Sequence, residues 1–396
     1  MIAENMKPLV KNNSVIRQMF EEGDRLRAIY GADKVFDFSL GNPNVPAPAE
    51  VKEAFLDILE NEDPIKVHGY MSNAGFPEVR HAIAESLNKR FKTDFGMHNI
   101  LMTVGAGSAL NVAFRILLNP GDEVLTFAPY FVEYGNYVSN YGGKLSVVPA
   151  NTENFQPDLE TFKKMVSPKT KMVVINTPHN PTGVIYTEET IRKLTDILYD
   201  KQMEFGTEIF LLSDEPYREL VYDDVEVPYV TRYYANTLVA YSFSKTLSLP
   251  GERIGYLLIP DDAVDSSEMI AAAGIAIRVS GSVNAPSLIQ LVVGRCLDLK
   301  ADISYYKRNR DTLYGALKEY GFSCTEPQGA FYLWVKTPTE DDKAFVAAAK
   351  SHNILVVPGS SFACPGYVRL AYCVSYETIK GSLPGFKELA REYFGE

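Results

Sequence analysis

The sequence predicts an α/β protein in which a mainly parallel β-sheet is covered by helices on both faces, with a smaller α+β domain beside it. In the middle of the chain, short apolar strands alternate with helical segments, which is typical of a parallel sheet. After about residue 290 this alternation stops, and helices and strands follow in a different order. The 396 residues, 46% of them hydrophobic, suffice to form two cores.

The first 45 residues have no place in the order of the predicted sheet. They contain the segment 36–43, Phe-Asp-Phe-Ser-Leu-Gly-Asn-Pro. We assign residues 1–45 to an N-terminal arm that is part of the small domain, residues 46–289 to the large domain, and residues 290–396 to the small C-terminal α+β domain.

Five predicted strands of the large domain run directly into segments rich in small, aromatic or polar residues. The strands are predicted over 100–104, 123–127, 171–176, 209–213 and 238–241. The segments that follow them, in the same order, are 105–107, 128–131, 177–183, 214–217 and 242–245. A helix over 108–118 follows the first of them. Because the carboxyl ends of parallel strands share one edge, where ligands bind in open α/β sheets, we expect the five segments to converge there.

Beyond residue 290, the pattern predicts a helix over 301–320, a strand over 330–335 and a helix over 341–351. Strands over 354–357 and 368–373 and a terminal helix follow. This order is typical of an α+β domain, and a cleft between it and the large domain is the expected place for an active site.

Charge and composition argue against several classes of protein. The net charge of −11 speaks against nucleic acid or an anionic membrane as a partner, because both bind basic surfaces. The four cysteines and five histidines show no metal-ligand spacing, so we expect no metal site. The N-terminus is polar, and the longest run of small apolar residues, 270–277, is too short to span a bilayer. We therefore expect a soluble, cytoplasmic protein.

Lys245 is the residue that best indicates the chemistry. It follows an apolar strand, and burial there lowers the pKa of a lysine and increases the fraction of free amine that attacks an aldehyde. Ser242 and Arg253, close to it in sequence, suit a phosphate group. An amine beside a phosphate site is what pyridoxal 5′-phosphate requires, since its aldehyde bonds to lysine and its phosphate anchors the ring.

The segment 105–108 opens a helix directly after a strand, which leaves backbone N–H groups at the positive end of the helix dipole to bind a phosphate. A tight turn without a ligand is the alternative. A dinucleotide site is disfavoured because Leu110 stands where the third glycine of that motif belongs. No hydrolase nucleophile elbow and no Walker loop occurs in the sequence.

Asp214 ends an apolar strand, and a carboxylate at this place suits the pyridine nitrogen of the cofactor. The alternative is that Asp214 is a helix-cap or turn residue, which the same sequence pattern also predicts. Tyr217 and Asn180 are candidate donors to the phenolate oxygen of the ring, while Asn180-Pro181 is also an ordinary turn dipeptide.

Three further residues are candidates for contacts with the ring or the substrate. Arg369 is a charge inside an apolar strand, so it requires a partner, either a substrate carboxylate or an internal acid. Phe131 suits stacking on the ring or packing in the core. Arg278 is a candidate for a second substrate carboxylate, but a solvated or ion-paired arginine is the simpler interpretation.

Taken in order, the motifs resemble those of the class I/II aminotransferases of pyridoxal-phosphate fold type I, from about Asp37 to Tyr372. The motifs that carry the resemblance are 41–43 (Gly-Asn-Pro), Tyr70 with 74–75 (Ala-Gly), 105–107 (Gly-Ala-Gly), 180–183 (Asn-Pro-Thr-Gly), 214–217 (Asp-Glu-Pro-Tyr), 242–245 (Ser-Phe-Ser-Lys), 253–256 (Arg-Ile-Gly-Tyr), 329–332 (Gly-Ala-Phe-Tyr), 358–359 (Pro-Gly) and Arg369.

The resemblance implies a role for each candidate. Lys245 carries the cofactor covalently and moves the proton, Asp214 pairs with the pyridine nitrogen, and Asn180 and Tyr217 bind the phenolate oxygen. The groups implied to hold the phosphate are Ser242, Arg253, the backbone of Ala106 and Gly107, and Tyr70 from a partner subunit. Because Tyr70 is contributed by the partner, the resemblance implies a homodimer.

The resemblance also implies that Arg369 binds the substrate α-carboxylate, with Gly41 and Asn180 beside it. Phe131 replaces the tryptophan or tyrosine that often stacks on the ring. Arg278 precedes an Asn-Ala-Pro segment much as an arginine of dicarboxylate-specific relatives precedes Asn-Pro, but the register differs.

The expected activity is transfer of the amino group of an L-amino acid to a 2-oxo acid, with 2-oxoglutarate as acceptor and aspartate or a broad set of amino acids as donors. Two alternatives stay open. A carbon-sulfur β-lyase uses the same scaffold, and a ligand-sensing regulator uses it without catalysis. The regulator normally has a DNA-binding module ahead of this fold, whereas only about forty residues precede it here, without a basic helix-turn-helix pattern.

Overall fold

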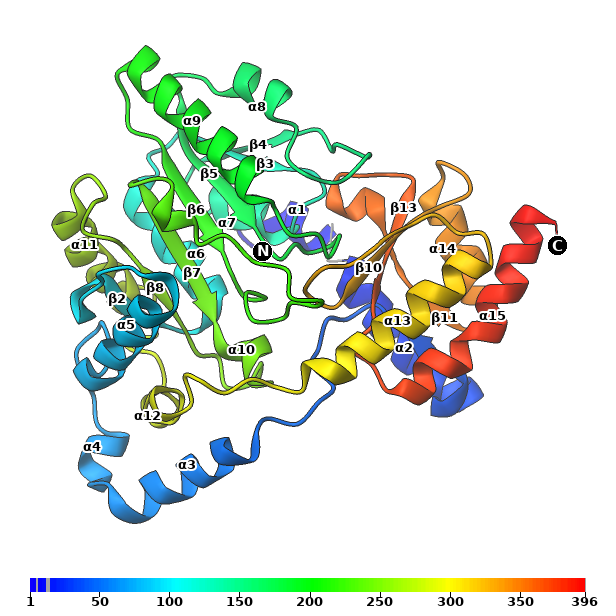
Figure 1. Cartoon of the computed structure of the whole chain (residues 1–396), viewed down its shortest axis with the longest axis horizontal. Helices are drawn as coiled ribbons and strands as arrows, with labels where there is room; N and C mark the ends of the chain where they lie inside the picture. The colour runs from blue at the N-terminus through cyan, green and yellow to red at the C-terminus, as the bar shows by residue number, and fades with distance from the viewer. Residues whose placement is uncertain (5, 12–14, 396) are drawn as a thin grey trace.

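A seven-stranded sheet forms the larger part of the computed structural model, which describes residues 1–4, 6–11 and 15–395 (Figure 1). In spatial order the strands are β2 (Ile100–Thr103), β8 (Gly255–Leu258), β7 (Thr237–Ser242), β6 (Phe210–Asp214), β5 (Thr170–Asn176), β3 (Glu123–Phe127) and β4 (Lys144–Val148). Only β8 runs antiparallel to its neighbours in this sheet. The predicted fold class, a mainly parallel sheet, is confirmed.

Both faces of this sheet are covered. Successive side chains of a strand point to opposite faces, so each strand contributes to a core on either side. On β5, Met172 and Val174 belong to the core on one face, and Val173 and Ile175 to the core on the other. The first face packs against α6 (Gly105–Leu117), α7 (Glu133–Ser139) and α11 (Ser266–Val279). The second packs against α8 (Leu159–Met165) and α9 (Glu188–Phe205) and, toward β2, against α3 (Ala49–Asn61), α5 (Pro77–Phe91) and α12 (Ser287–Arg295).

The smaller part contains a four-stranded antiparallel sheet of β12 (Val357–Pro358), β13 (Tyr367–Ala371), β10 (Tyr332–Lys336) and β9 (Cys324–Thr325). Its helices are α13 (Ile303–Glu319), α14 (Asp342–Ser351) and α15 (Tyr376–Phe394). A second, two-stranded sheet joins β1 (Phe36–Asp37) to β11 (Ile354–Leu355) in parallel. This pairing attaches the segment before residue 45 to the C-terminal region.

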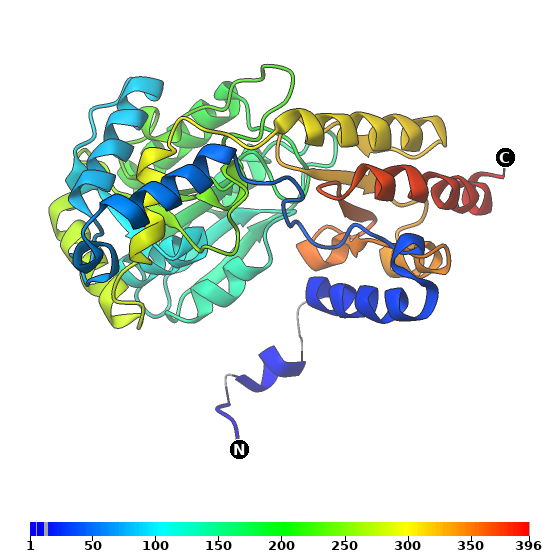
Figure 2. The ribbon, with the colours of Figure 1, turned by 90° about the horizontal axis from the view of Figure 1, so that it is seen from below.

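The N-terminal region adds α2 (Val15–Tyr30), which packs on the smaller part through Leu26 and Leu355 and through an ion pair of Arg27 with Asp37 at 2.7 Å. Figure 2 shows the two parts side by side, with α1 (Met6–Lys11) projecting away from both. The domain boundaries after residues 45 and 289 stay a prediction, and residues 5, 12–14 and 396 lie outside the described ranges.

Several predicted boundaries are wrong. The helix expected over 108–118 begins at Gly105, and the strand expected from residue 330 begins at Tyr332. The strand expected over 354–357 is two strands, because β11 pairs with β1 whereas β12 pairs with β13. Neither β8 nor β4 was predicted.

Within the described ranges, no helix is both long and apolar enough to cross a membrane. The same residues contain no cluster of three or more His, Cys, Asp or Glu side chains suited to bind a metal ion.

Candidate active site at the carboxyl edge of the large sheet

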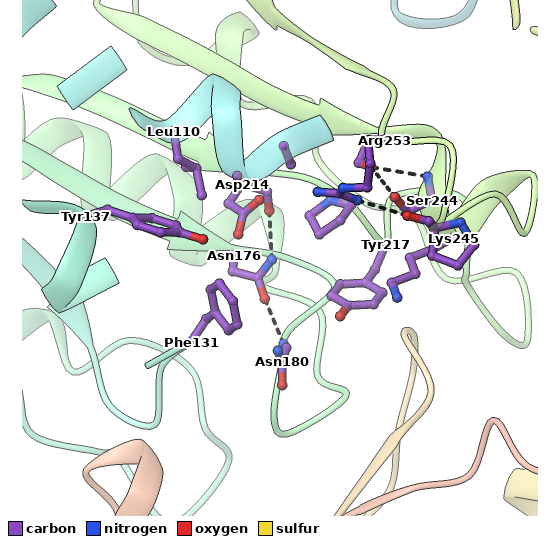
Figure 3. Close-up of a pocket in the computed structure, with 15 residues that line it drawn as sticks. Leu110, Phe131, Tyr137, Asn176, Asn180, Asp214, Tyr217, Ser244, Lys245 and Arg253 are labelled. Atoms are coloured by element: carbon purple, nitrogen blue, oxygen red, sulfur yellow. Dashed lines mark hydrogen bonds between the residues drawn. The ribbon is translucent and has the colours of Figure 1, made fainter. Parts of the chain in front are cut away.

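A cavity of about 210 Å³ lies where the carboxyl ends of β5, β6 and β7 meet the start of α6 (Figure 3). Nine of the residues that the sequence analysis selected line it: Ala106, Gly107, Phe131, Asn180, Asp214, Tyr217, Ser242, Lys245 and Arg253. The remaining lining residues are Leu110, Tyr137, Asn176, Pro216, Ser244 and Pro250. All five segments that follow the predicted strands therefore supply lining residues.

Lys245 reaches the cavity from the short helix α10 (Phe243–Thr246), whose N-cap is Ser242. The hydroxyl of Ser242 accepts a hydrogen bond from the Ser244 N–H at 3.1 Å and so caps the first turn of the helix. The Lys245 amine donates to the carbonyl oxygen of Gly41 at 2.7 Å. Burial is the main reason that the pKa of Lys245 is lowered to about 8, and the nearby cations Arg253 and Arg369 contribute to this lowering.

Asp214 is buried at the end of β6 and has two unlike oxygens. Oδ2 accepts a hydrogen bond from the Tyr134 hydroxyl at 2.6 Å, whereas Oδ1 is buried and has no partner in the part of the chain that the structure describes. Burial raises the pKa of this carboxyl to about 7, against the lowering effect of Tyr134. Because a buried acceptor without a donor is costly, Oδ1 suits the protonated nitrogen of a bound ring.

Hydrogen bonds hold the amide side chains beside Asp214 (Figure 3). Asn176 Nδ2 donates to the backbone carbonyl of Asp214 at 2.8 Å, and Asn176 Oδ1 accepts from the backbone N–H of Asn180 at 2.7 Å. The Tyr217 hydroxyl lies 2.8 Å from the Tyr332 hydroxyl. The backbone of Asn180 and the side chain of Tyr217 are thus fixed at the cavity wall, and Asn180 Oδ1 accepts from Arg369 Nη1 at 3.1 Å, so both side chains can donate to an oxygen on a ring.

One end of the cavity concentrates groups that bind anions. Ala106 and Gly107 lie in the first turn of α6, a helix of 13 residues whose N-terminal N–H groups point outward. Ser242, Ser244 and Arg253 line the cavity as well, and Arg253 lies beside Gly105 at the start of this helix. Among the described residues, Arg253 forms no ion pair, and its Nη1 donates to the Pro250 carbonyl at 3.1 Å. A phosphate would satisfy these donors.

Gly105 makes this end of the cavity possible. It has a φ of +75°, and a Cβ there would lie 2.9 Å from Arg253 Nη2. A side chain at this position would therefore be strained and would displace the arginine.

Arg369 is buried on β13 next to the cavity. Its Nη2 donates to the Ser39 carbonyl at 2.6 Å and its Nη1 to Asn180 Oδ1 at 3.1 Å, while its Nε is buried without a partner. No carboxylate of the described chain pairs with it, so the internal ion pair left open by the sequence does not occur there. A buried guanidinium without a counterion suits a carboxylate ligand.

Gly41 and Tyr332 lie between Arg369 and Lys245. The Tyr332 ring centroid is 4.6 Å from the Arg369 guanidinium carbon. A Cβ on Gly41 would collide with the Tyr332 hydroxyl, so this position requires glycine. The close approach places the Gly41 carbonyl, which accepts from Lys245, beside the tyrosine.

The structure does not bring Tyr70 or Arg278 to this cavity. Tyr70 is 92% exposed, and Arg278 is exposed in the last turn of α11. Neither lines the cavity of its own chain. The loop after α11 and the segment after Tyr70 are nevertheless neighbours, because Asn284 Nδ2 donates to the carbonyls of Met71 and Ser72.

Sequence reasoning assigned no role to Asn176, Ser244, Tyr134, Tyr137 and Tyr332, although Tyr332 belongs to the motif 329–332. Asn176 and Ser244 lie inside segments that the analysis had selected, at the ends of β5 and β7, and the same polar signal could have identified them. Tyr134 and Tyr332 could not be found in this way, because each acts through a hydroxyl whose partner is distant in sequence.

One cavity thus contains an amine, a carboxylate oxygen without a partner and a set of anion-binding groups. Pyridoxal 5′-phosphate requires these three for its aldehyde, its ring nitrogen and its phosphate. The residues of the chain fit this cofactor.

Comparison with known proteins gives a consistent result. The model of the family described as aminotransferase class I and II matches residues 33–382. The aspartate aminotransferase of Thermotoga maritima is 33% identical over 358 residues, which cover 89% of this chain and 90% of that protein. The aspartate aminotransferase of Pyrococcus horikoshii is 31% identical, over 96% of this chain and 94% of the relative.

Solved structures agree over nearly the whole length. An aminotransferase from Eubacterium rectale has a TM-score of 0.97 and 46% identity, with 100% of this chain and 99% of that chain covered. The aspartate aminotransferase of Thermus thermophilus with maleate has a TM-score of 0.85 and 28% identity, with 95% and 96% covered.

Proposed function

Because this chain belongs to the class I and II aminotransferases, which use pyridoxal 5′-phosphate, we propose that it moves the amino group of an L-amino acid to 2-oxoglutarate. We propose aspartate, or a broad set of amino acids that includes it, as the donor. The observation that carries the proposal is the cavity shared by Lys245, whose pKa is lowered to about 8, and Asp214, whose Oδ1 has no partner among the described residues.

The cofactor supplies a covalent attachment for an amine and a ring that withdraws electrons from the carbon being deprotonated. Asp214 accepts the hydrogen of the ring nitrogen, and Asn180 and Tyr217 donate to the phenolate oxygen. Ser242, Arg253 and the backbone of Ala106 and Gly107 hold the phosphate. Phe131 covers the face of the ring.

Lys245 has two tasks in the proposed reaction, as the covalent anchor and as the base that takes the α-proton from the substrate. A pKa of about 8 leaves about one tenth of the amine neutral at pH 7, far more than for an ordinary lysine near 10.4. The hydrogen bond to the Gly41 carbonyl holds the nitrogen at the cavity in the protein without substrate.

Arg369 binds the α-carboxylate in this proposal, with Gly41 and Asn180 beside it. Its buried Nε without a partner supports this role, because a carboxylate that approaches it would accept from a donor that the described chain leaves unused. Both the amino acid and the 2-oxo acid carry this carboxylate, so one site can serve both half-reactions in a ping-pong sequence.

The proposed donor preference depends on the proposed dimer, because Arg278 would reach the substrate only in the neighbouring subunit. Tyr70 is 92% exposed, and the larger part also exposes apolar side chains on α3, α4 (Pro64–His68) and α11: Leu56, Leu59, Ile65, Ile275 and Val279. Exposed apolar groups support burial against a second subunit. We propose a homodimer in which Tyr70 reaches the phosphate of the neighbouring site and Arg278 faces its substrate.

The names of two relatives, both aspartate aminotransferases, favour aspartate as one donor. Arg278 would then bind the side-chain carboxylate of aspartate or glutamate across the subunit interface. A cytoplasmic location stays a prediction.

The test is the visible absorbance of the protein loaded with pyridoxal 5′-phosphate, recorded as single L-amino acids are added without an acceptor. Amino transfer predicts stoichiometric loss of the yellow band and its return on addition of 2-oxoglutarate, and the amino acids that bleach it fastest identify the donors. Continuous release of 2-oxo acid and ammonia without an acceptor would instead identify a β-lyase. A protein that the cofactor cannot turn yellow would contradict the roles of Lys245 and Asp214.

Lys245→Ala is the matched variant for this test. It removes the covalent anchor and the base together, so neither the bleaching nor its reversal should occur. Normal turnover in this variant would contradict the proposed role of Lys245.

A further inference from the structure

Tyr134 makes the one hydrogen bond to the side chain of Asp214 within the described residues. Its hydroxyl donates to Oδ2 at 2.6 Å, and the two residues are 80 positions apart in the chain. Tyr134 is 1% exposed and does not line the cavity itself. It therefore acts on a ligand only through Asp214.

Packing fixes the position of this hydroxyl. Tyr134 lies on α7 in the core between α6 and the sheet. Its ring meets Phe131 edge to face, with the centroids 5.5 Å apart and an interplanar angle of 84°, and lies 6.3 Å from the Tyr130 ring. A buried aromatic ring in such contacts has little freedom to move. Tyr134 thus touches both the proposed stacking residue and the proposed partner of the ring nitrogen.

The hydrogen bond divides the two oxygens of Asp214 between two tasks. Because Tyr134 donates to Oδ2, only Oδ1 remains free, and Oδ1 is the oxygen without a partner in the described chain. A donated hydrogen bond also stabilises the ionised carboxylate relative to the neutral acid. Without it, the low-dielectric surroundings would favour a proton on Asp214 itself.

The other groups that interact with Asp214 do not replace this effect. Glu215 is an acid, which raises the pKa of Asp214, and it is already paired with Arg218, whose Nη2 lies 2.7 Å from Glu215 Oε1. Tyr217 and Tyr137 also interact electrostatically with Asp214, but they lie on the cavity side and donate no hydrogen bond to it.

We propose that Tyr134 is a positioning residue that stabilises the ionised form of Asp214 and presents Oδ1 to the ring nitrogen of the cofactor, so that the shared proton stays on the ring. This inference rests on the proposed role of Asp214. According to this inference, Tyr134 as well as Asp214 determines how strongly the ring withdraws electrons. If the proton moved to the carboxyl, the ring would be neutral and would stabilise the α-carbanion less.

The first test uses the cofactor-free protein and the variant Tyr134→Phe, which keeps the ring and removes the hydroxyl. The protonation of Asp214 is followed by the infrared carbonyl band of the neutral acid, in difference spectra against Asp214→Asn. The titration midpoint of Asp214 should rise by about one to two pH units, the usual size for a hydrogen bond to a charged group. The matched control is Tyr130→Phe, a neighbouring tyrosine that makes no hydrogen bond to Asp214, and it should leave the midpoint unchanged.

The second test measures where the shared proton lies in the loaded protein. With pyridoxal 5′-phosphate labelled with ¹⁵N in the ring, the nitrogen chemical shift distinguishes a protonated from an unprotonated ring. We expect the protonated shift in the wild type and in Tyr130→Phe, and a shift toward the unprotonated value in Tyr134→Phe. An unchanged nitrogen shift in Tyr134→Phe would overturn the proposal, even if the carboxyl midpoint moved.

A second variant keeps the inference testable if Tyr134→Phe does not fold. Replacement of Tyr134 by 3-fluorotyrosine, a stronger hydrogen-bond donor of nearly the same shape, should lower the midpoint of Asp214. A midpoint equal to that of the wild type would overturn the proposal. The proposed function fails separately, because a protein unable to bind the cofactor would still give the carboxyl titration of the first test.

Discussion

Lys245, Asp214 and Arg369 each place an ionisable group where the surroundings disfavour its charge. Burial lowers the pKa of Lys245 to about 8, raises that of Asp214 to about 7 and lowers that of Arg369. Each group also keeps an unused interaction or a reactive form: a neutral amine, an Oδ1 without a donor and an Nε without an acceptor in the described chain. The free protein therefore gives up stability at the positions where a ligand would restore it.

Replacing Asp214 by asparagine should stabilise the cofactor-free protein at neutral and alkaline pH. The carboxyl pKa is raised from 3.8 to about 7, so over this range the folded state binds a proton that the unfolded state has released. The stability from this group is complete below about pH 4 and is lost as the pH rises through about 7. The loss is on the order of 4 kcal/mol, at about 1.4 kcal/mol for each pKa unit.

Urea unfolding of the cofactor-free proteins at several pH values measures this effect. The free energies of unfolding of wild type and Asp214→Asn should agree near pH 4 and diverge toward pH 8, with the variant more stable. Asp223→Asn is the control, because Asp223 is half exposed, is paired with Lys307 and Arg310, and has a lowered pKa. Parallel curves for wild type and Asp214→Asn would contradict the buried, raised carboxyl.

Arg369→Ala and Arg278→Ala should affect donors in different ways. Loss of Arg369 removes the hydrogen bonds to a group that every amino acid shares, so kcat/KM should fall about 100-fold or more for all donors. Loss of Arg278 should reduce kcat/KM only for aspartate and glutamate. The measurement is kcat/KM for aspartate, glutamate, phenylalanine and alanine in both variants. Equal losses for all four donors in Arg278→Ala would remove the reason to expect a dicarboxylate preference.

At the scale of single residues, the sequence predicts best the side chains that follow strands. Lys245 and Asp214 could be selected because strand ends converge in a parallel sheet, whatever the details of packing. The role of Tyr332 could not be predicted, since its hydroxyl meets that of Tyr217 across 115 positions of the chain. Such contacts depend on how the smaller part sits on the larger one, and no local pattern records that.

At the scale of helices and strands, the sequence predicts individual strands of the large sheet but not their spatial order. Periodicity identifies a buried strand but not its neighbours, so the antiparallel β8 between β2 and β7 escaped prediction. The strand expected over 354–357 shows the same limit. Its residues are apolar throughout, and only the pairing with β1 and β13 divides it into two.

Gly105→Ala tests whether the turn from β2 into α6 shapes the phosphate end of the cavity. Alanine would have to adopt a φ of +75° and would place its Cβ 2.9 Å from Arg253 Nη2. We expect the affinity for pyridoxal 5′-phosphate to fall about 10-fold, because the arginine is displaced from the phosphate end, while the strain of about 1 to 3 kcal/mol lowers the stability of the fold. The dissociation constant is measured by fluorescence titration of the cofactor-free protein.

Gly274→Ala is the matched control for this turn. It lies within α11, and an added Cβ would meet no atom within 4 Å. This variant should bind the cofactor as the wild type does and should be as stable or slightly more so. An equal affinity for the cofactor in Gly105→Ala would contradict the proposed phosphate site.

At the scale of the whole molecule, the residues that line the cavity all belong to the larger part, and hydrogen bonds beside it connect the smaller part to two of them. Arg369 from the smaller sheet donates to Asn180 beside the larger one, and Lys245 donates to Gly41, which follows β1. The groups proposed to bind the substrate carboxylate and those proposed to bind the cofactor therefore come from different cores. The position of one part on the other decides whether they act together.

The proposed dimer makes a prediction about mixed subunits. If Tyr70 reaches the phosphate of the neighbouring site, Tyr70→Ala weakens the pocket of its partner, whereas Lys245→Ala destroys the pocket of its own chain. A heterodimer of the two variants then has one pocket with both defects and one with neither. Random reassociation of equal amounts makes about half of all dimers mixed, so about one quarter of the sites should be intact.

The measurement is aminotransferase activity after the two inactive or weakened homodimers are unfolded together and refolded, compared with each refolded alone. Recovery toward one quarter of the wild-type activity would support a site shared between subunits. The control pairs Lys245→Ala with Asp214→Asn, two changes in the same pocket of one chain, for which every mixed dimer has a defect in each site. If Tyr70 instead acted within its own chain, the first pair would behave like this control, because no pocket would escape both changes. Since Tyr70 is 92% exposed and absent from the cavity of its own chain, we expect the recovery.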